Sequence, residues 1–278
     1  MSQDKFRLAG VMGWPVMHSR SPRLHNKWLQ IHGLAGAYVP LAIAPDRVEA
    51  ALRALPALNF SGCNVTIPHK EEVARIADWI DPAAKAIGAA NCVAVQTDGS
   101  LSAFNHDHIG FIEALREGAP GWRAGQGPAV ILGAGGAARA IVYALREAGV
   151  SDIRVVNRTL ERAETLIEDF GNNVSAHAWE QRADVLTGAA LLVNTTSNGM
   201  VGQPPLDLSL DALPRGAVVN DIVYTPLETP LLVAARARGN VGVDGLGMLL
   251  HQARPAFHEW FGIWPELTPE IRAMMEAD

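Results

Sequence analysis

The segment that most constrains the fold is the run AVILGAGGAARAIVYALREAG at residues 129–149. Four apolar residues precede Gly133-x-Gly135-x-x-Ala138, and a helical pattern follows it. In such a strand–turn–helix, Gly133 allows the tight turn, Gly135 lets a pyrophosphate approach the backbone, and Ala138 permits close helix packing. The helix N-terminus presents unpaired N–H groups to phosphate oxygens. The segment predicts a dinucleotide-binding unit, with a packing turn in another kind of α/β protein as the alternative.

Strands and helices are expected to alternate around this turn. The apolar runs predict strands at 129–132, 153–157, 191–195 and 217–223, and helices at 136–148, 159–170, 228–238 and 245–260. Alternation of this kind predicts a parallel, doubly wound sheet of the Rossmann type. The fold class is therefore α/β.

The first hundred residues predict a second α/β region, with strands at 8–12, 38–43 and 62–67 and a helix at 45–55. Ser21 is expected to cap a helix that ends at Gly33. Pro68 is expected in the first turn of the helix that contains residues 71–79. At roughly 150 residues per domain, a length of 278 residues predicts two domains.

Charge and composition exclude several classes of protein. A formal net charge of −6 leaves no excess of cations for a nucleic acid or an anionic membrane surface. The charged first ten residues do not resemble a signal peptide, and no run of about 18 apolar residues is present. We therefore expect a cytoplasmic protein.

Cys63 and Cys92 lack the spacing of a disulfide framework or a zinc site, and are expected to be small buried residues.

The end of the second strand of the expected Rossmann unit favours NADP over NAD. An NAD-specific site usually carries Asp or Glu there for the ribose hydroxyls. This chain has Asn157-Arg158-Thr159 instead. The Arg158 guanidinium can pair with a 2′-phosphate and stack on adenine, Asn157 does not repel that phosphate, and Thr159 can cap the next helix. The alternative for Arg158 is a solvated surface cation.

Lys70 is a candidate for proton transfer. Hydride transfer to a ketone builds negative charge on oxygen, so the reaction needs a proton donor that a partner orients. A lysine paired with a carboxylate meets that need. The run NVTIPHK at 64–70 places Lys70 in the first turn of a helix, where the helix dipole opposes a cation. Such a placement is unfavourable unless a function or a partner compensates, and the alternative is again a solvated cation.

An ordered series of motifs extends over almost the whole chain. The series comprises Ser19-Arg20-Ser21, NVTIPHK, GAAN at 88–91, Asn105–Asp107, GAGGAARA, NRT, NTTSNGM, DIVYTPLETPLL and GLGMLLHQA. On these motifs the sequence resembles the shikimate dehydrogenase family, which includes shikimate and quinate dehydrogenases. So many motifs in one order are a very specific match.

The resemblance implies a role for individual residues. Lys70 and Asp107 would form the catalytic pair beside the reacting C3 oxygen, with Lys70 exchanging the proton and Asp107 orienting it. The substrate would be bound by Ser19, Ser21, Thr66, Asn91, Tyr224 and Gln252. The residues around NADP would be Gly133, Ala134, Gly135, Gly136, Ala137, Asn157, Arg158, Thr159, Arg162, Ile222, Gly245 and Met248.

Two positions depart from the family pattern. Family members commonly read N-T-D where this chain has Asn105-His106-Asp107, and N-T where it has Asn91-Cys92. His106 adjoins the expected catalytic carboxylate, where it could change the charge environment or contact the substrate or nicotinamide. His106 and His108 would also share one face of a strand, which invites a metal-site interpretation. We expect no metal, since spacing identifies no third ligand.

The resemblance further implies the domain roles and the reaction. Residues 1–106 plus 245–278 would form a substrate-binding catalytic domain, completed by the C-terminal helices, and residues 107–244 a Rossmann-like NADP-binding domain. The expected reaction is reversible hydride transfer between NADPH and 3-dehydroshikimate, giving shikimate in the route to chorismate and aromatic amino acids, by a monomer or homodimer. One alternative is a quinate or aminoshikimate dehydrogenase. The other is a catalytically silent NADP-binding regulator, which would be expected to lack Lys70 or Asp107.

Overall fold

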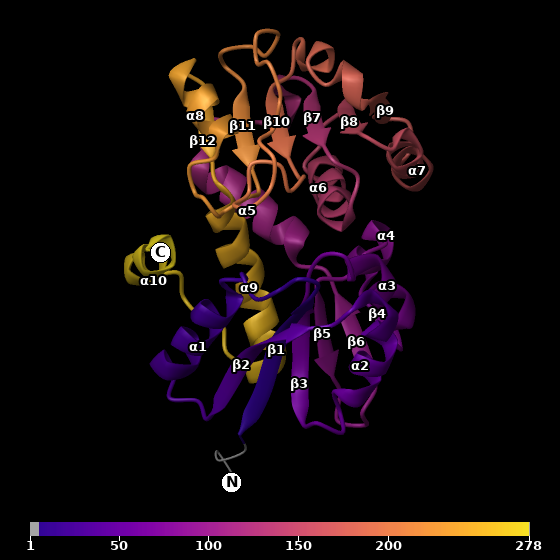
Figure 1. The fold of residues 1–278 in the computed structure, drawn as a ribbon, viewed down its shortest axis with the longest axis vertical. Helices are drawn as coiled ribbons and strands as arrows, with labels where there is room; N and C mark the ends of the chain where they lie inside the picture. The colour runs from indigo at the N-terminus through magenta and orange to yellow at the C-terminus, as the bar shows by residue number, and fades with distance from the viewer. Residues whose placement is uncertain (1–5, 278) are drawn as a thin grey trace. The chain divides into compact units, whose positions relative to one another are not determined.

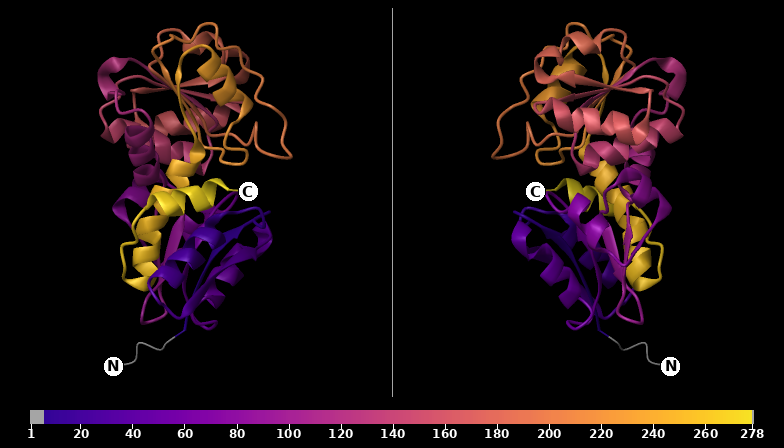
Figure 2. Two further views of the ribbon diagram at one scale, coloured as in Figure 1. Left: turned by 90° about the vertical axis from the view of Figure 1, so that its left-hand side faces the viewer. Right: turned by 90° about the vertical axis from the view of Figure 1, so that its right-hand side faces the viewer.

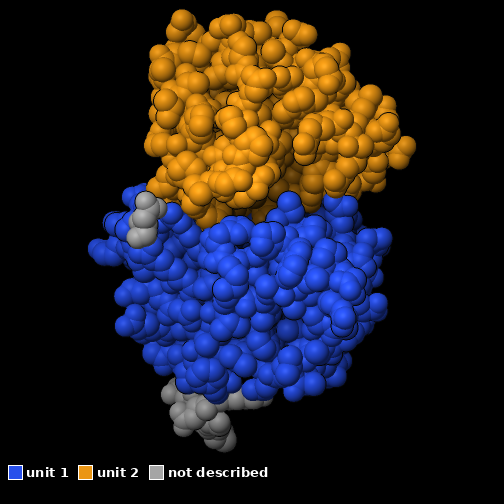
Figure 3. Space-filling view, in the orientation of Figure 1, with its two compact units in different colours: residues 1–106, 250–278 blue, residues 107–249 orange. Residues whose placement is uncertain are grey.

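The computed structural model describes residues 6–277. The chain divides into two compact units, one made of the residues up to His106 together with those from Leu250 onward, and the other of Asp107–Leu249. Figure 3 colours these units, here called unit 1 and unit 2. The second boundary falls within a single helix, α9 (Gly245–Phe261). Each unit contains its own sheet (Figure 1).

Unit 1 is built on a six-stranded mixed sheet in the order β2-β1-β3-β5-β6-β4. Its strands are β1 (Arg7–Gly13), β2 (Gly36–Ala42), β3 (Phe60–Val65), β4 (Trp79–Ile80), β5 (Cys92–Val95) and β6 (Leu101–Phe104). Its helices are α1 (Ser21–Ile31), α2 (Val48–Ala54), α3 (Lys70–Ile76), α4 (Pro82–Ile87), most of α9, and α10 (Pro269–Glu276). β1 runs parallel to β2 and β3, whereas β5 is antiparallel to β3 and β6.

Two helix starts in unit 1 differ from the prediction. Ser21 does not cap α1, because it is the first helical residue and Arg20 occupies the N-cap position without a side-chain capping bond. Pro68 lies before α3 and not in its first turn. The carbonyl of Thr66 accepts a hydrogen bond from the N–H of His69, so residues 66–69 form a turn and the helix starts only after it.

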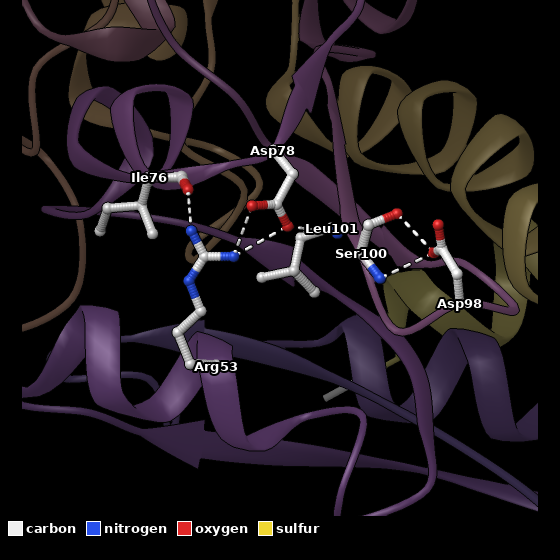
Figure 4. Close-up of polar contacts among 6 residues, drawn as sticks. All are labelled: Arg53, Ile76, Asp78, Asp98, Ser100 and Leu101. Atoms are coloured by element: carbon white, nitrogen blue, oxygen red, sulfur yellow. Dashed lines mark hydrogen bonds and ion pairs between the residues drawn. The ribbon is translucent and has the colours of Figure 1, made fainter.

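Side-chain contacts join α2 to the strands of unit 1 (Figure 4). Nη1 of Arg53 lies 2.8 Å from both carboxylate oxygens of Asp78, and the same carboxylate accepts the N–H of Leu101 at 2.9 Å. These bonds lower the pKa of Asp78, the Leu101 N–H contributing most and Arg53 next. Asp98 closes the β5–β6 hairpin by accepting the backbone N–H and the hydroxyl of Ser100.

Unit 2 has a six-stranded, entirely parallel sheet in the order β12-β11-β10-β7-β8-β9. Its strands are β7 (Ala129–Leu132), β8 (Ile153–Asn157), β9 (Val174–Ala178), β10 (Leu191–Asn194), β11 (Val218–Asp221) and β12 (Val241–Val243). Its helices are α5 (Asp107–Gly118), α6 (Gly136–Glu147), α7 (Leu160–Phe170) and α8 (Pro230–Ala237). Counted from β9, the strand order is 3-2-1-4-5-6, which is the Rossmann order. The predicted α/β class and doubly wound sheet are confirmed.

Hydrophobic cores cover both faces of the unit 2 sheet. Ala129 and Ile131 of β7 pack in the core formed with α5, α6 and α7, while Val130 and Leu132 pack in the core formed with α8. Strands buried on both faces have nearly continuous apolar sequences, which explains why the sequence predicts this part of the sheet. Helices lie on both sides of these strands in Figure 2.

The two cysteines are free and buried, as expected. Burial raises the pKa of the Cys63 thiol to about 12 and also raises that of Cys92. Within residues 6–277, no helix is both long enough and apolar enough to cross a membrane.

Candidate active site

One edge of the unit 1 sheet collects the ends of four strands. Met12 at the end of β1 is in register with Val65 at the end of β3. Cys92, the first residue of β5, pairs with Phe104, the last residue of β6. The carboxyl ends of β1, β3 and β6 and the amino end of β5 therefore share this edge. In open α/β sheets, ligands bind outside the carboxyl ends of the strands.

The segments that follow β1 and β3 at this edge carry three of the predicted substrate residues of unit 1. Ser19 and Ser21 follow β1, and the Ser19 hydroxyl accepts the N–H of Ser21 at 3.3 Å. Thr66 follows β3, where its N–H donates to the carbonyl of Met12 at 2.8 Å. A Cβ added to Gly13 would lie 2.5 Å from the Thr66 methyl group, so Thr66 packs directly against the end of β1.

Lys70 is the first residue of α3, in the first helical turn as the sequence predicts, and its side chain is half-buried. The acidic residues Glu71 and Glu72 follow it in the same turn. Its carbonyl accepts the N–H of Ala90 at 2.8 Å, which attaches the segment before β5 to the start of α3. Lys70 and the segment carrying Asn91 are thus held in a fixed relation by the backbone.

Asn91 and Gln252 are in direct contact although 161 positions separate them in the sequence. Nδ2 of Asn91 donates to Oε1 of Gln252 at 3.0 Å, and Oδ1 of Asn91 accepts the N–H of His106 at 2.7 Å. Both side chains are buried. Asn105 adds a bond from Nδ2 to the carbonyl of Ala89 at 2.8 Å. The structure therefore joins two predicted substrate residues that local sequence patterns could not connect.

The glycine-rich turn of unit 2 follows β7. Gly133 has φ +105°, and a Cβ there would lie 2.5 Å from Oγ1 of Thr195, so the protein itself requires glycine at this position. Gly135 is different, because it is extended and a Cβ on it would meet nothing within 4 Å. Protein packing does not explain glycine at 135. The open space beside the N-terminus of α6 fits a pyrophosphate, which approaches the backbone at this point of the motif.

The residues after β8 are polar and basic. Asn157 donates from Nδ2 to the carbonyl of Thr159 at 2.8 Å. Thr159 occupies the N-cap of α7, but its hydroxyl makes no capping bond there, contrary to the prediction. Arg158 and Arg162 are exposed around the same helix start. Two guanidinium groups at the start of a helix suit a phosphate monoester, such as the 2′-phosphate of NADP.

Asp107 opens α5 and is 4% exposed. A carboxylate in the first turn of a helix is stabilised by the positive end of the helix dipole. Asp107 belongs to unit 2 and Lys70 to unit 1, so their catalytic pairing stays a prediction.

The remaining predicted residues of unit 2 lie near the ends of β11 and β12. Ile222 and Tyr224 follow β11 and are half-buried. A Cβ on Gly245 would be 2.2 Å from the carbonyl of Ile222, so packing against that carbonyl requires glycine. Met248 is 7% exposed and belongs to the core on the α5 face of the sheet.

Sequence reasoning missed a buried carboxylate at the ends of β10 and β11. Asp221 accepts hydrogen bonds from Nδ2 of Asn194 at 2.9 Å, the hydroxyl of Thr229 at 2.7 Å and the N–H of Val223 at 3.1 Å. Burial raises the pKa of Asp221 to about 6, and these bonds lower it in part. The three side chains stand in the motifs NTTSNGM and DIVYTPLETPLL, so a search for polar residues at strand ends would have found them.

The metal interpretation of His106 and His108 rested on a shared strand, and that geometry is wrong. His108 lies in α5, which begins at Asp107. The His106 ring stacks on Phe104 with the centroids 5.8 Å apart, and the His108 ring is perpendicular to that of Tyr143 with the centroids 5.3 Å apart. Among residues 6–277, no three His, Cys, Asp or Glu side chains are grouped so as to hold a metal ion.

Comparison with known proteins identifies the family. Residues 11–93 match the model of the shikimate dehydrogenase substrate binding domain, and residues 123–201 match the shikimate / quinate 5-dehydrogenase model. The chain is 57% identical over 271 residues to the shikimate dehydrogenase (NADP(+)) of Paramagnetospirillum magneticum, covering 98% of both chains. It belongs to the shikimate dehydrogenase family.

Solved structures of the shikimate dehydrogenase family share the whole fold. The shikimate 5-dehydrogenase of Thermus thermophilus, in complex with NADP(H) and shikimate, has a TM-score of 0.84 at 38% identity, covering 98% of both chains. The quinate dehydrogenase of Corynebacterium glutamicum, in complex with NAD, has a TM-score of 0.86 at 31% identity, again covering 98% of both chains. Members with different substrates and cofactors thus have one architecture, and individual residues must decide between them.

Proposed function

We propose that this protein is an NADP-dependent shikimate dehydrogenase, which reversibly converts 3-dehydroshikimate and NADPH to shikimate and NADP. The observation that carries the proposal is the 57% identity, over 98% of both chains, to a protein named shikimate dehydrogenase (NADP(+)). The reaction belongs to the route to chorismate and the aromatic amino acids.

The cofactor half of the site lies in unit 2. Gly133–Ala137 would hold the pyrophosphate, since a Cβ on Gly135 meets nothing within 4 Å, and Asn157–Thr159 with Arg162 would hold the adenosine end. Arg158 and Arg162 pair with the 2′-phosphate, and the absence of Asp or Glu at Asn157-Arg158-Thr159 favours NADP over NAD. Ile222, Gly245 and Met248 complete the set, which makes unit 2 the cofactor domain.

The substrate half of the site lies mainly in unit 1. The hydroxyls of Ser19 and Ser21 bind the substrate carboxylate. Ring hydroxyls or the carboxylate are bound by Thr66, Asn91 and Gln252, with Tyr224 supplied by unit 2. The shared edge of the unit 1 sheet supports this assignment, because Thr66 and Asn91 adjoin its strand ends. Unit 1 is therefore the substrate domain.

Lys70 and Asp107 handle the proton. When bound, NADPH supplies the hydride to the C3 carbonyl carbon. Lys70 Nζ donates a proton to the C3 oxygen during reduction and takes it back during oxidation. Asp107 would be the carboxylate partner in this step, accepting a hydrogen bond from the substrate hydroxyl and orienting the proton transfer.

A matrix of initial rates tests the function, with shikimate or quinate as the substrate and NADP or NAD as the cofactor. We expect the highest kcat/KM for shikimate with NADP. Faster turnover of quinate with NAD would assign the protein to the second candidate, a quinate dehydrogenase like the NAD-bound structural relative. No turnover together with tight NADPH binding would indicate a regulator.

We also propose that the enzyme acts in the cytoplasm as a monomer or homodimer, on small molecules and without a nucleic-acid or membrane partner. Its net charge of −6 supports this, because nucleic acids and anionic lipids recruit cationic surfaces. Light scattering coupled to size exclusion measures the oligomeric state directly.

A further inference from the structure

A buried chain of hydrogen bonds crosses unit 1 and ends at the proposed substrate residues. Oη of Tyr38, on β2, donates to Oδ1 of Asn64 on β3 at 2.7 Å. Nδ2 of Asn64 donates to the carbonyl of Asn91 at 3.0 Å, and Nδ2 of Asn91 donates to Oε1 of Gln252 at 3.0 Å. All four residues are buried. We call this chain, from Tyr38 to Gln252, the carboxamide relay.

Two backbone groups fix the direction of the relay. The carbonyl of Asn91 can only accept, so Asn64 must turn its Nδ2 toward it and its Oδ1 toward Tyr38. The hydroxyl of Tyr38 is therefore the donor. The N–H of His106 can only donate, so Asn91 turns its Oδ1 toward it and its Nδ2 toward Gln252. A carboxamide flipped in place would set two donors or two acceptors face to face.

Neighbouring side chains contact both the backbone and the ring of Tyr38. Its backbone N–H and carbonyl both bond to the Asn26 side chain, each at 2.9 Å. The His25 ring stacks on it with the centroids 4.2 Å apart and the planes 4° from parallel. The centroid of the Trp260 ring lies 5.8 Å from that of the Tyr38 ring. With ring and backbone fixed, the hydroxyl is directed at Asn64.

We propose that Tyr38 is a positioning residue for substrate binding, acting through Asn64 to orient the side chains of Asn91 and Gln252. The proposal rests on the proposed function, which assigns those two residues to the substrate. It adds an orientation to that assignment, because Oε1 of Gln252 accepts from Nδ2 of Asn91 and is therefore directed at Asn91.

The test is Tyr38→Phe, which removes the hydroxyl and keeps the ring. We expect the KM for shikimate to rise about 3- to 10-fold, the worth of one hydrogen bond. The kcat and the KM for NADP should stay within about twofold, since the proposed function assigns the ends of the relay to substrate binding and not to proton transfer or the cofactor. Asn64→Asp is the second variant, because it still accepts from Tyr38 but no longer donates to the Asn91 carbonyl. It should raise the same KM.

Trp28→Phe is the matched control. It lies in the same aromatic cluster, 5.5 Å from the His25 ring, and loses one hydrogen bond, from Nε1 to the carbonyl of Glu266. It should leave the KM for shikimate unchanged. A KM that is unchanged in folded Tyr38→Phe, or raised equally in Trp28→Phe, would overturn the positioning role.

A second measurement does not depend on turnover. Hydrogen exchange of the His106 amide, followed by NMR, should be at least about threefold faster in Tyr38→Phe than in Trp28→Phe, because its acceptor Asn91 becomes less ordered. Equal exchange refutes the relay. Wild-type protein without shikimate activity refutes the proposed function, and exchange then decides the relay alone.

Discussion

Lys70 is the residue on which the proposed chemistry depends most. Lys70→Ala should lower kcat by roughly 10²- to 10⁴-fold, the usual contribution of general acid–base catalysis, and leave NADPH binding intact. Steady-state rates and a fluorescence titration with NADPH measure the two effects. Lys85→Ala, which removes an exposed lysine of α4, is the matched control and should be fully active. Full activity of Lys70→Ala would remove Lys70 from the mechanism.

His25 should make the stability of the protein depend on pH. Burial lowers its pKa from 6.5 to about 3, and among residues 6–277 neither ring nitrogen has a hydrogen-bond partner. The folded state thus holds the neutral ring, and its stabilising effect is complete above pH 6.5. It is lost as the pH falls from 6.5 toward 3, by about 1.4 kcal/mol per pH unit.

Asp221 should change the free energy of unfolding with pH in the opposite direction. Its pKa rises from 3.8 to about 6 on folding, so the folded state prefers the protonated carboxyl. Its contribution to the free energy of unfolding declines as the pH rises from 3.8 to about 6, and is constant above that. Between about pH 4 and 6 the effects of His25 and Asp221 oppose each other.

Urea unfolding of His25→Phe and Asp221→Asn between pH 4 and 8 separates these two effects. His25→Phe should lose less stability than wild type on acidification below pH 6.5. Asp221→Asn should lose more than wild type below pH 6. His18→Asn, at an exposed position, serves as the control and should follow the wild-type curve. Curves parallel to wild type for either buried variant would contradict its assignment.

At the scale of elements, the turn between β7 and α6 separates two reasons for a glycine. Gly135→Ala adds a methyl group that meets nothing in the protein within 4 Å, so stability should change by less than about 1 kcal/mol. The KM for NADP should rise at least about 10-fold, because the methyl group occupies the pyrophosphate space. Gly245→Ala, by contrast, should destabilise the protein. Its methyl group collides with the Ile222 carbonyl, so the melting temperature should fall.

Thermal melts and NADP titrations of the two variants distinguish these cases. Gly121→Ala is the control, at a glycine that also has no neighbour within 4 Å but lies outside the turn. If Gly135→Ala bound NADP as tightly as Gly121→Ala does, the pyrophosphate would have to lie elsewhere.

The elements that the sequence revealed are those with a local signal. β7 and β8 were predicted with their observed limits, because both lie in the interior of the sheet and are centred on buried, mostly apolar residues. The edge strands β9 and β12 were missed, since VSAHA is mostly half-buried and VGV has three residues. The residues of the candidate site likewise divide into those with a local sequence signal and those without one. Glycine turns and motif residues were recognised locally, whereas Asn91 meets Gln252 across 161 positions and only the fold reveals the contact.

At the scale of the molecule, the two units should respond separately to their ligands. In hydrogen exchange followed by mass spectrometry, saturating NADP should protect peptides covering 129–140 and 157–162, and shikimate should protect those covering 19–25, 64–72 and 88–92. Each ligand at 100 times its Kd should also raise global stability by about 2.7 kcal/mol if it binds only the folded state. Peptides of β9, at the sheet edge, are the internal control. Protection of unit 1 alone by NADP would contradict the division of roles.

The placement of unit 2 within the sequence of unit 1 has a consequence for biosynthesis. All of unit 2 is synthesised before the segment from Leu250 onward, and domains generally fold as units during synthesis. Unit 1 cannot complete its fold until that segment has been made. Until it arrives, Asn91 lacks Gln252, and the carbonyl of Val93 lacks the Trp260 indole that later bonds to it at 2.9 Å. Unit 2 can therefore fold first, and the segment from Leu250 onward then completes the proposed substrate site of unit 1.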